Sequence, residues 1–308
     1  MRFVSFDAGE RASVRCSPEG DPRCGARPID DRAALLPQRS GCAPTGGPQA
    51  GELRGDRVIA LGEPGAGGLA AIVRAGLPRE PAEGDGVPLA DVELLPPIAD
   101  PSKIVCIGLN YRSHAEEQGA EPPETPTFFA KFANALAAPG ATVTLPGYSS
   151  KVDYEAEVAF VIGARARDVP ETAALEHVAG YMLFNDLSAR DYQFKTPQWM
   201  PGKVFDGSAP CGPALVTADE AGPHDAIEIA LTLNGERRQH ATTGDLVHSV
   251  PALVAYLSSL MTLEPGDIVS TGTPAGVGSL RDPRTWLAAG DEVVIDSPQL
   301  GTLATRLA

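Results

Sequence analysis

The sequence predicts an α+β protein in which strands outnumber helices, and three patterns support this. An apolar run ends the segment 153–162, and a second fills 180–184. Apolar residues alternate with polar or small ones from 227 to 233, and Asn234-Gly235 follows, a dipeptide that favours a two-residue hairpin turn. Apolar residues recur at helical spacing over 250–260, which predicts one helix packed on the core.

The N-terminal part of the chain predicts a small α/β region. Residues 1–7 have the pattern of an edge strand, and 69–77 that of a short helix. Between them, about 14–54 is rich in Pro and Gly with little periodic hydrophobicity, which indicates a long insertion or a disordered segment. Pro96-Pro97 marks a boundary. We therefore expect a small region at 1–97, with the insertion, and a larger domain at 98–308.

A pair of glutamates suggests a metal site. In a strand, Glu155 and Glu157 share a face about 7 Å apart at Cα. Two carboxylates on an otherwise apolar strand are unfavourable unless something compensates their charge. Oxygen ligands suit Mg²⁺, Mn²⁺ or Ca²⁺ rather than zinc. The alternative is a strand at a sheet surface with both glutamates solvated.

Two further charged residues are candidates for the same site. Asp186 directly follows an apolar run, at the end of a predicted buried strand, and is either a third carboxylate ligand or the N-cap of the next helix. Lys203 lies between turn residues and an apolar pair. It would hold an anionic substrate or stabilise a developing enolate near a metal, or else is an ordinary surface lysine.

A predicted strand at 104–107 leads into a Gly-Leu-Asn turn and a helix, which Asn110 would cap. His114 and Glu117 are spaced i, i+3 and share a face of this helix. A glutamate that orients a histidine makes a general base for activating water. The alternative is an ordinary surface pair.

A glycine- and threonine-rich loop follows the predicted strand at 267–270. Its backbone N–H groups, with the hydroxyls of Thr271 and Thr273, would hold a carboxylate. The loop lacks the lysine of a P-loop, so we do not expect a nucleotide site. The alternative is a tight turn that needs glycine.

Composition excludes several classes of protein. With 25 basic and 40 acidic residues, the net charge of −15 argues against nucleic acid or an anionic membrane as a partner. The sequence has no apolar run of membrane-spanning length and no signal-peptide core at its start, so we expect a cytoplasmic protein. Cys106 and Cys211 lie in apolar surroundings, which predicts core thiols; the remaining cysteines match no zinc spacing: Cys16, Cys24 and Cys42.

The motifs occur in a recognisable order. They are G-x-N-Y-x-x-H-x-x-E (108–117), F-x-K (129–131), D-Y-E-x-E (153–157), N-D-x-S-x-R-D-x-Q (185–193), G-K-x-F-D (202–206), N-G-E (234–236) and T-G-T-P-x-G-V-G (271–278). This series resembles the short, bacterial-type members of the fumarylacetoacetate hydrolase family over about residues 98–308. The resemblance implies a mainly β roll of mixed sheets, a cofactor of Mg²⁺ or Mn²⁺, and a homodimer.

The resemblance also implies roles for individual residues. The metal ligands are Glu155, Glu157 and Asp186. The pair that activates water is His114 and Glu117, and Lys203 is the active-site lysine. The residues near the substrate or metal are Arg190, Gln193 and Thr273. The resemblance gives no clear role to Lys131 of the F-x-K motif. This intact set argues against a catalytically idle scaffold.

For the reaction, the resemblance implies a divalent-metal-dependent hydrolase that cleaves a C–C bond in a 1,3-diketo acid of the acylpyruvate or fumarylpyruvate type. The presence of both His114 and Glu117 favours hydrolysis, because a water must be activated. The alternatives within the family are an oxaloacetate-type decarboxylase and an isomerase of 2-hydroxyhepta-2,4-diene-1,7-dioate, a compound of aromatic catabolism.

Overall fold

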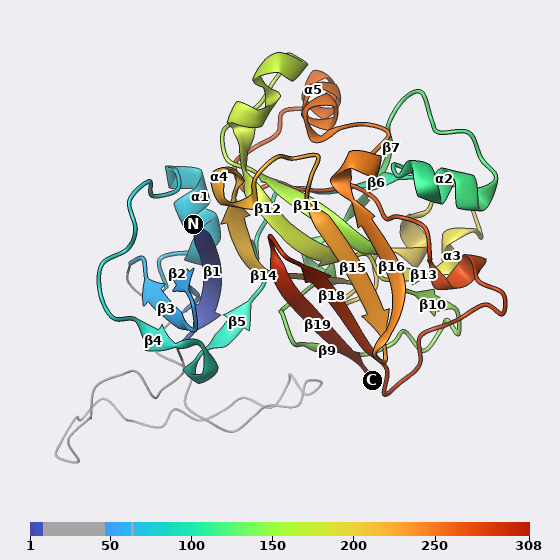
Figure 1. The fold of residues 1–308 in the computed structure, drawn as a ribbon, viewed down its shortest axis with the longest axis horizontal. Coiled ribbons are helices and arrows are strands. Elements are labelled where there is room, and N and C mark those ends of the chain that lie inside the picture. Colours follow the sequence, from blue (N-terminus) through green and yellow to red (C-terminus); the bar gives the residue numbers. More distant parts are fainter. Residues whose placement is uncertain (9–46, 63–64) are drawn as a thin grey trace, which may run out of the picture.

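The computed structural model describes residues 1–8, 47–62 and 65–308, and its fold is α+β with strands predominating, as predicted (Figure 1). Most strands belong to one sheet of twelve, in the order β4-β3-β2-β1-β14-β12-β11-β17-β6-β7, with β5 paired to β1 and β8 to β14. Its strands are β1 (Arg2–Asp7), β2 (Gln49–Arg54), β3 (Arg57–Ala60), β4 (Val87–Pro88), β5 (Glu93–Leu95), β6 (Ile104–Gly108), β7 (Thr127–Lys131), β8 (Leu136–Ala137), β11 (Ala156–Ile162), β12 (Val178–Asn185), β14 (Ala209–Thr217) and β17 (Ile268–Ser270).

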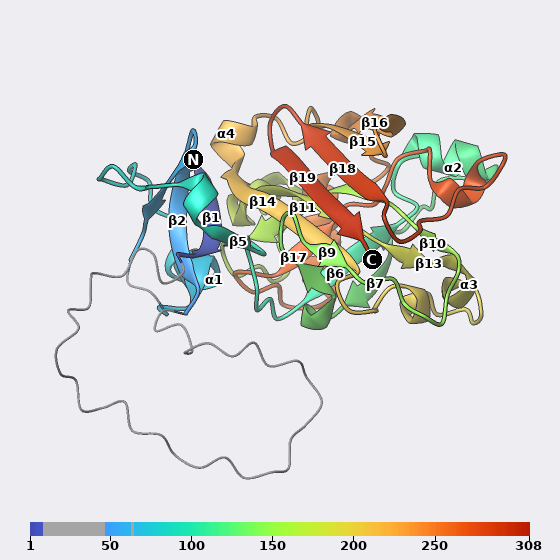
Figure 2. The same ribbon diagram turned by 90° about the horizontal axis from the view of Figure 1, so that it is seen from below.

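A second sheet of five strands packs across one face of the large sheet (Figure 2). Its strands, in sheet order, are β16 (Glu236–Thr242), β15 (Glu228–Leu233), β18 (Glu292–Ser297), β19 (Gly301–Leu307) and β9 (Thr142–Val143). A short antiparallel pair completes the strands: β10 (Val152–Asp153) and β13 (Ser188–Ala189). The two large sheets enclose the main core between them.

The helices are short and lie around the sheets. The α-helices are α1 (Gly68–Ala75), α2 (Arg112–Gln118), α3 (Arg190–Gln193), α4 (Ala218–Ala221) and α5 (Val250–Leu260). The 3₁₀ turns are η1 (Leu89–Asp91), η2 (Ala133–Ala135), η3 (Glu171–His177), η4 (Met200–Gly202), η5 (Thr243–Asp245) and η6 (Gly278–Leu280). The predicted helix at 250–260 is α5, and Ser249 caps it by accepting a hydrogen bond from the N–H of Ala252 at 3.3 Å.

Strand β11 is buried along its whole length because apolar residues fill both of its faces. Val158, Phe160 and Ile162 point into the core between the two sheets, together with side chains of β15 and β18. Ala159 and Val161 point to the opposite face, into a second core shared with α1 and β6. The strand is therefore a rigid platform, and its N-terminal end positions the glutamates.

The N-terminal region differs from prediction in two places. Strand β1 is an interior strand and not an edge strand, because it pairs with β2 on one side and with β14 and β5 on the other. Residues Gln49–Arg54, assigned to the end of the insertion on composition, form strand β2 instead. Most of the predicted insertion lies outside the described residues, as do Cys16, Cys24 and Cys42. Alternating small and polar residues in β2 hid its strand pattern.

Two local predictions are confirmed. Asn234 and Gly235 join β15 to β16 with φ values of 52° and 80°, the left-handed conformation that a two-residue hairpin turn of this type requires. Cys106 and Cys211 are buried free thiols. Burial raises the pKa of both, that of Cys211 to about 12, so neither supplies a thiolate nucleophile at neutral pH.

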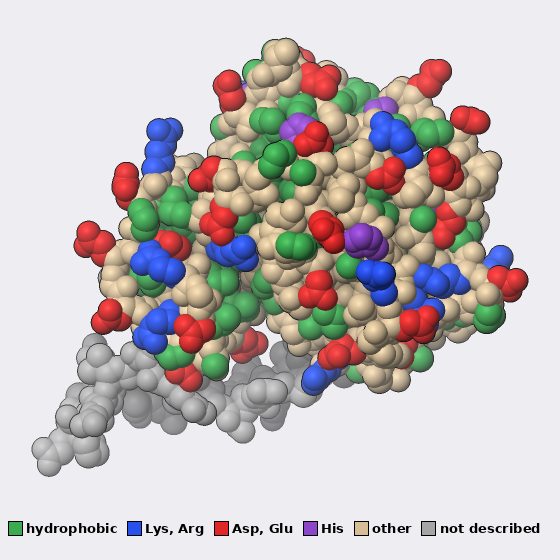
Figure 3. Space-filling model, in the orientation of Figure 1, with side chains coloured by type: hydrophobic (Ala, Val, Ile, Leu, Met, Phe, Trp, Pro, Cys, Tyr) green, Lys and Arg blue, Asp and Glu red, His purple; other side chains and the backbone are tan. Residues whose placement is uncertain are grey.

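The surface fits the acidic composition. On the face shown in Figure 3, basic side chains are scattered among acidic ones, and the described residues form no continuous basic area there. None of the helices in the described ranges combines the length and hydropathy of a membrane span.

Candidate metal centre and its cavity

The paired ends of β11 and β12 bring three carboxylates together. Ala156 lies opposite Asn185 across the pair, and the N–H of Asp186 donates to the carbonyl of Glu155 at 3.0 Å. Glu155, Glu157 and Asp186 each place a carboxylate oxygen so that these atoms lie within 4.8 Å of one another. All three residues are at most 5% exposed. The alternative of a solvated sheet surface is therefore wrong.

Asp186 does not cap a helix, since the next helix, α3, has Ala189 at its N-cap position. Its carboxylate is instead held between two buried lysines. Lys131 Nζ lies 2.8 Å from Oδ1, and Lys203 Nζ lies 2.8 Å from Oδ2. Lys203 also lies 2.8 Å from Glu155 Oε2, and at 2% exposure it is not a surface lysine.

Lys131 has a supporting position that the sequence did not indicate. Its side chain is completely buried and does not line the cavity. Besides the ion pair with Asp186, its ammonium donates to the carbonyls of Leu187 and Ser208 and to the Ser208 hydroxyl. Lys131 thus fixes Asp186 from behind while Lys203 faces the cavity.

The three carboxylates have different electrostatic surroundings. Burial would raise the pKa of Glu155, but the cations of Arg190 and Lys203 more than offset it and hold this pKa at about 2. Burial raises the pKa of Glu157 well above its usual range, and repulsion from Asp186 and Glu155 adds to the effect. Among the described residues, Glu157 has only neutral donors: the Ser270 hydroxyl and the N–H of Gly272 at 3.2 Å.

This donor set fits a divalent cation. A cation among the three carboxylates would supply the countercharge that Glu157 lacks. Oxygen-only ligands favour Mg²⁺ or Mn²⁺ over zinc. Without the metal, four buried carboxylates, those of Asp153, Glu155, Glu157 and Asp186, face three buried cations, those of Lys131, Arg190 and Lys203.

Arg190 and Gln193 lie beside this cluster, as expected. Arg190 Nη1 is 2.6 Å from Glu155 Oε1 and donates to Gln193 Oε1 at 3.0 Å. Its other side binds Asp153, a residue that belongs to the D-Y-E-x-E motif but was not singled out. Asp153 alternates with Glu155 and Glu157 along the chain, and this spacing could have marked it as a candidate site residue.

The predicted dyad is formed. His114 Nδ1 lies 2.9 Å from Glu117 Oε2, and the amide nitrogen of Gln118, a residue the sequence did not single out, lies 2.8 Å from His114 Nε2. A carboxylate only accepts hydrogen bonds, so the ring proton is placed on Nδ1 and Nε2 carries the lone pair. Glu117 Oε1 accepts from the N–H of Gly276 at 2.9 Å. These contacts fix the orientation of the imidazole ring, with Nε2 as its acceptor.

The roles predicted for Asn110, as a helix cap, and for Thr271, as a ligand-binding hydroxyl, are wrong. Asn110 does not cap α2; its side chain joins Thr271 to His248, donating to both carbonyls and accepting from the N–H of His248. Thr271 does not face a ligand, because its hydroxyl donates to the carbonyl of Val158. Thr273 does line the cavity, although its hydroxyl donates to Ala156 and accepts from Gln239.

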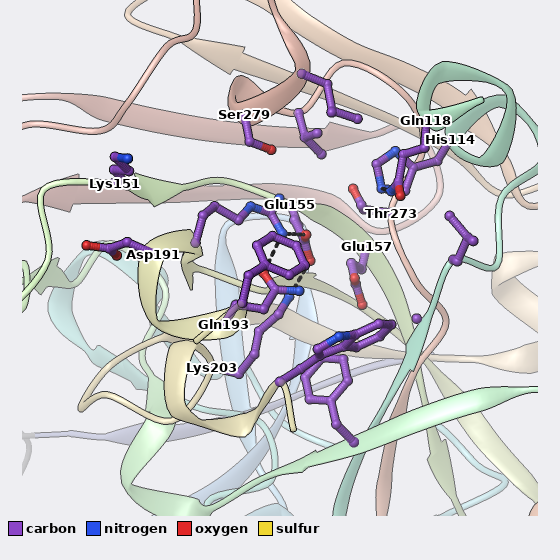
Figure 4. A pocket seen from close by; sticks show the side chains of 18 of the residues that line it. His114, Gln118, Lys151, Glu155, Glu157, Asp191, Gln193, Lys203, Thr273 and Ser279 are labelled. Carbon is purple, nitrogen blue, oxygen red and sulfur yellow. Dashed lines mark hydrogen bonds and ion pairs between the residues drawn. The ribbon is translucent and has the colours of Figure 1, made fainter. Parts of the chain in front are cut away.

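All these groups meet at one cavity of about 450 Å³. Figure 4 shows His114 and Gln118 on the opposite side of it from Glu155, Glu157 and Lys203, with Thr273 between. Its apolar walls are Ile107, Leu109, Phe129, Phe194, Trp199, Val277, Leu280 and Trp286. Lys151 and Arg284 also line it, and neither side chain has an ion-pair partner among the described residues.

Comparison with known proteins places this site in a family. The model for the C-terminal domain of fumarylacetoacetate (FAA) hydrolase matches residues 103–308. The chain belongs to this family, and it is an enzyme of the group that includes hydrolases, isomerases and oxaloacetate tautomerases.

Three relatives define the range of reactions. The mitochondrial oxaloacetate tautomerase fahd2 of Xenopus laevis is 42% identical over 217 residues, covering 70% of this chain and 68% of the relative. The 2-hydroxyhepta-2,4-diene-1,7-dioate isomerase of Mycobacterium marinum aligns with a TM-score of 0.65 and 38% identity, covering 74% and 82%. Fumarylpyruvate hydrolase of Pseudomonas aeruginosa, solved with Mn²⁺ and pyruvate, gives 0.62 and 34%, covering 70% and 91%.

The raised pKa of Glu157 predicts a stability effect. As the pH rises past the usual glutamate pKa of about 4.5, the unfolded chain releases this proton first. The metal-free fold therefore loses stability until Glu157 itself ionises. Glu157→Gln should raise the melting temperature in EDTA at pH 8, while Mn²⁺ should stabilise the wild type only. Differential scanning fluorimetry measures both; Glu228→Gln, at an exposed glutamate, is the control. A variant that is less stable than wild type in EDTA would contradict this.

Proposed function

We propose that this enzyme catalyses keto–enol isomerisation of 2-oxo dicarboxylic acids, with a divalent cation held by Glu155, Glu157 and Asp186. The observation that carries the proposal is the position of His114. Its Nδ1 is fixed by Glu117, and its Nε2, which accepts from the Gln118 amide and must exchange that contact for the substrate, lies across the cavity from Glu155 and Glu157.

The cation, when bound, would act as a Lewis acid on the carbonyl oxygen of the substrate. The four buried carboxylates and three buried cations of the site have a net charge of −1, and a bound divalent cation would change it to +1. An anionic 2-oxo acid would balance this excess. Mg²⁺ and Mn²⁺ both suit these oxygen ligands.

The chain's own residues supply the proton transfer. His114 Nε2 takes a proton from the carbon next to the oxo group, and the electron pair of the broken C–H bond forms the C=C bond of the enol. The oxo oxygen then takes up a proton from solvent, and His114 releases the proton it took to solvent, so that no proton is gained or lost overall. The ammonium of Lys203 and the guanidinium of Arg190 stabilise negative charge that develops on this oxygen. Ketonisation of an enol runs the same steps in reverse.

Substrate length is suggested by the cavity. Its volume of about 450 Å³ holds roughly fifteen waters at about 30 Å³ each, which is more than a four-carbon acid fills. Lys151 lies away from Glu155 and Glu157 (Figure 4), and neither it nor Arg284 has an ion-pair partner among the described residues, so both can bind an anion. Aromatic side chains, including Trp199 and Trp286, line the same cavity as the carboxylates and these two cations. This arrangement supports a longer chain that ends in a second carboxylate.

Hydrolysis of a 1,3-diketo acid is the second candidate. The same His114–Glu117 pair can deprotonate a water for attack on the distal carbonyl. The enolate of the leaving 2-oxo acid would be stabilised by the groups named above. The 42% identity to a tautomerase, against 34% to a fumarylpyruvate hydrolase, is why we place isomerisation first. The homodimer expected from the family stays a prediction.

The first test compares three substrates with Mg²⁺ and with EDTA: oxaloacetate, 2-hydroxyhepta-2,4-diene-1,7-dioate and acetylpyruvate. We expect metal-dependent loss of enol absorbance with the first two, and little cleavage of the third. Metal-dependent release of pyruvate from acetylpyruvate, with slow isomerisation, would make hydrolysis the function instead.

His114→Asn should lower kcat for isomerisation by about 10²–10⁴, because the amide cannot accept the substrate proton. His240→Asn is the matched control, since that histidine is 49% exposed and pairs with Glu228 on strand β15. Stopped-flow measurement of enol absorbance gives the rates. An unchanged kcat in the His114 variant would show that it is not the base, and a loss confined to hydrolysis would assign it to water activation.

Arg284→Ala should raise KM for 2-hydroxyhepta-2,4-diene-1,7-dioate by about twofold to fivefold, as expected for an exposed charge pair. KM for oxaloacetate should change less, because we expect this shorter acid not to extend from the carboxylate cluster to Arg284. Arg165→Ala, at an exposed arginine that pairs with Glu264, is the control. If Arg284→Ala changed KM equally for both substrates, Arg284 would not bind the distal carboxylate of the longer one.

A further inference from the structure

Asp153 is the most heavily hydrogen-bonded carboxylate beside the metal site, and neither a substrate contact nor a metal ligand explains it. It lies on β10, opposite Ser188 of β13, and is fully buried. It does not line the cavity and is not one of the three clustered carboxylates. Both of its oxygens are nevertheless saturated with donors.

One side of this carboxylate holds Arg190. Asp153 Oδ2 accepts a hydrogen bond from Arg190 Nε at 2.9 Å and forms an ion pair with Nη2 at 2.9 Å, which holds this side of the guanidinium. The remaining nitrogen, Nη1, then points at Glu155 Oε1 at 2.6 Å. Because the guanidinium is rigid and planar, the contact at one end sets the direction of the other. Asp153 thereby determines where Arg190 holds Glu155.

The other side of the carboxylate holds the loop at the edge of the cavity. Oδ1 accepts from the N–H of Gly278 at 2.7 Å, and Oδ2 from that of Ser279 at 3.0 Å. A Cβ on Gly278 would lie 2.7 Å from Oδ1 and 2.2 Å from the carbonyl of Thr285, so only glycine allows this approach. Two residues earlier, the N–H of Gly276 binds Glu117 of the dyad.

We propose that Asp153 is a positioning residue for the metal centre: through Arg190 it fixes the carboxylate of Glu155, and through Gly278 and Ser279 it anchors the loop that holds Glu117. This inference rests on the proposed metal function. Removal of a group that orients a metal ligand typically weakens metal affinity by about 10-fold to 100-fold. Asp153 is expected to act with that magnitude although it never contacts the ion.

The test measures Mn²⁺ affinity by electron paramagnetic resonance and calorimetry on the full chain. Asp153→Asn keeps the size of the side chain but turns one oxygen into a donor that faces the Arg190 guanidinium. We expect its Mn²⁺ Kd to rise about tenfold or more. The spectrum of bound Mn²⁺ should also change, a readout that loss of stability alone does not produce.

Asp267→Asn is the matched control. Asp267 is 1% exposed, pairs with Lys103, and accepts from the N–H groups of Lys103 and Glu264, yet it does not contact the carboxylate cluster. This variant should lower the melting temperature and leave Mn²⁺ affinity unchanged. Equal weakening of affinity in both variants would assign the effect to general destabilisation and overturn the proposal.

A double-mutant cycle tests the route through Arg190. Arg190→Lys keeps the charge but loses the rigid, planar guanidinium that joins Asp153 to Glu155, so its effect and that of Asp153→Asn on Mn²⁺ affinity should not add. Wild-type affinity in Arg190→Lys would overturn the proposal even if Asp153→Asn fails to fold. Wild-type protein that binds no Mn²⁺ would overturn the metal site and this inference together, whereas binding by wild type and Asp153→Asn alike would overturn this inference alone.

Discussion

The structure around the cavity depends on the burial of four carboxylates in an apolar setting. Removing ionised groups from water is unfavourable unless each finds a countercharge or several donors. Asp153 and Glu155 share Arg190, and Asp186 lies between two lysines. Of these four carboxylates, Glu157 is the one with no ion pair, and only neutral donors contact it. This imbalance selects for a cation of higher charge at the same point, and the surrounding strands and loop hold the ligands ready for it.

The sequence indicated the parts of this arrangement that depend on local spacing. Glu155 and Glu157 alternate on one strand, and His114 and Glu117 occupy one helix face, so their proximity follows from strand and helix periodicity. The role of Lys131 was not predictable, because its partners lie 55 to 77 positions further along the chain. Asn110 was misassigned for the same reason: its amide joins two distant backbone segments rather than the adjacent helix. Strand β1 has the composition of an edge strand, and only the sheet order places it inside.

The residues that would support the shared chemistry differ from those that would select the substrate. The carboxylate cluster and the proposed histidine base suit any reaction that passes through an enolate, and the relatives include a tautomerase, an isomerase and a hydrolase. What distinguishes such reactions is the part of the substrate beyond the reacting carbons. In this chain that part would contact Trp199, Trp286 and two cations, Lys151 and Arg284. All four residues come from loops rather than from the paired strands. Specificity can therefore change without disturbing the acids.

The pairing of β1 with β2 has an evolutionary consequence. Phe6 lies opposite Gln49 although more than forty positions separate them, so the connecting segment leaves and re-enters the sheet at neighbouring points. As a general rule, each doubling of the length of a loop costs only about 0.6 kcal/mol of closure free energy. Pairing of β1 with β14 on its other side keeps the register independent of that connection. Insertions or deletions between β1 and β2 would therefore cost little closure free energy and leave the residues around the cavity in place.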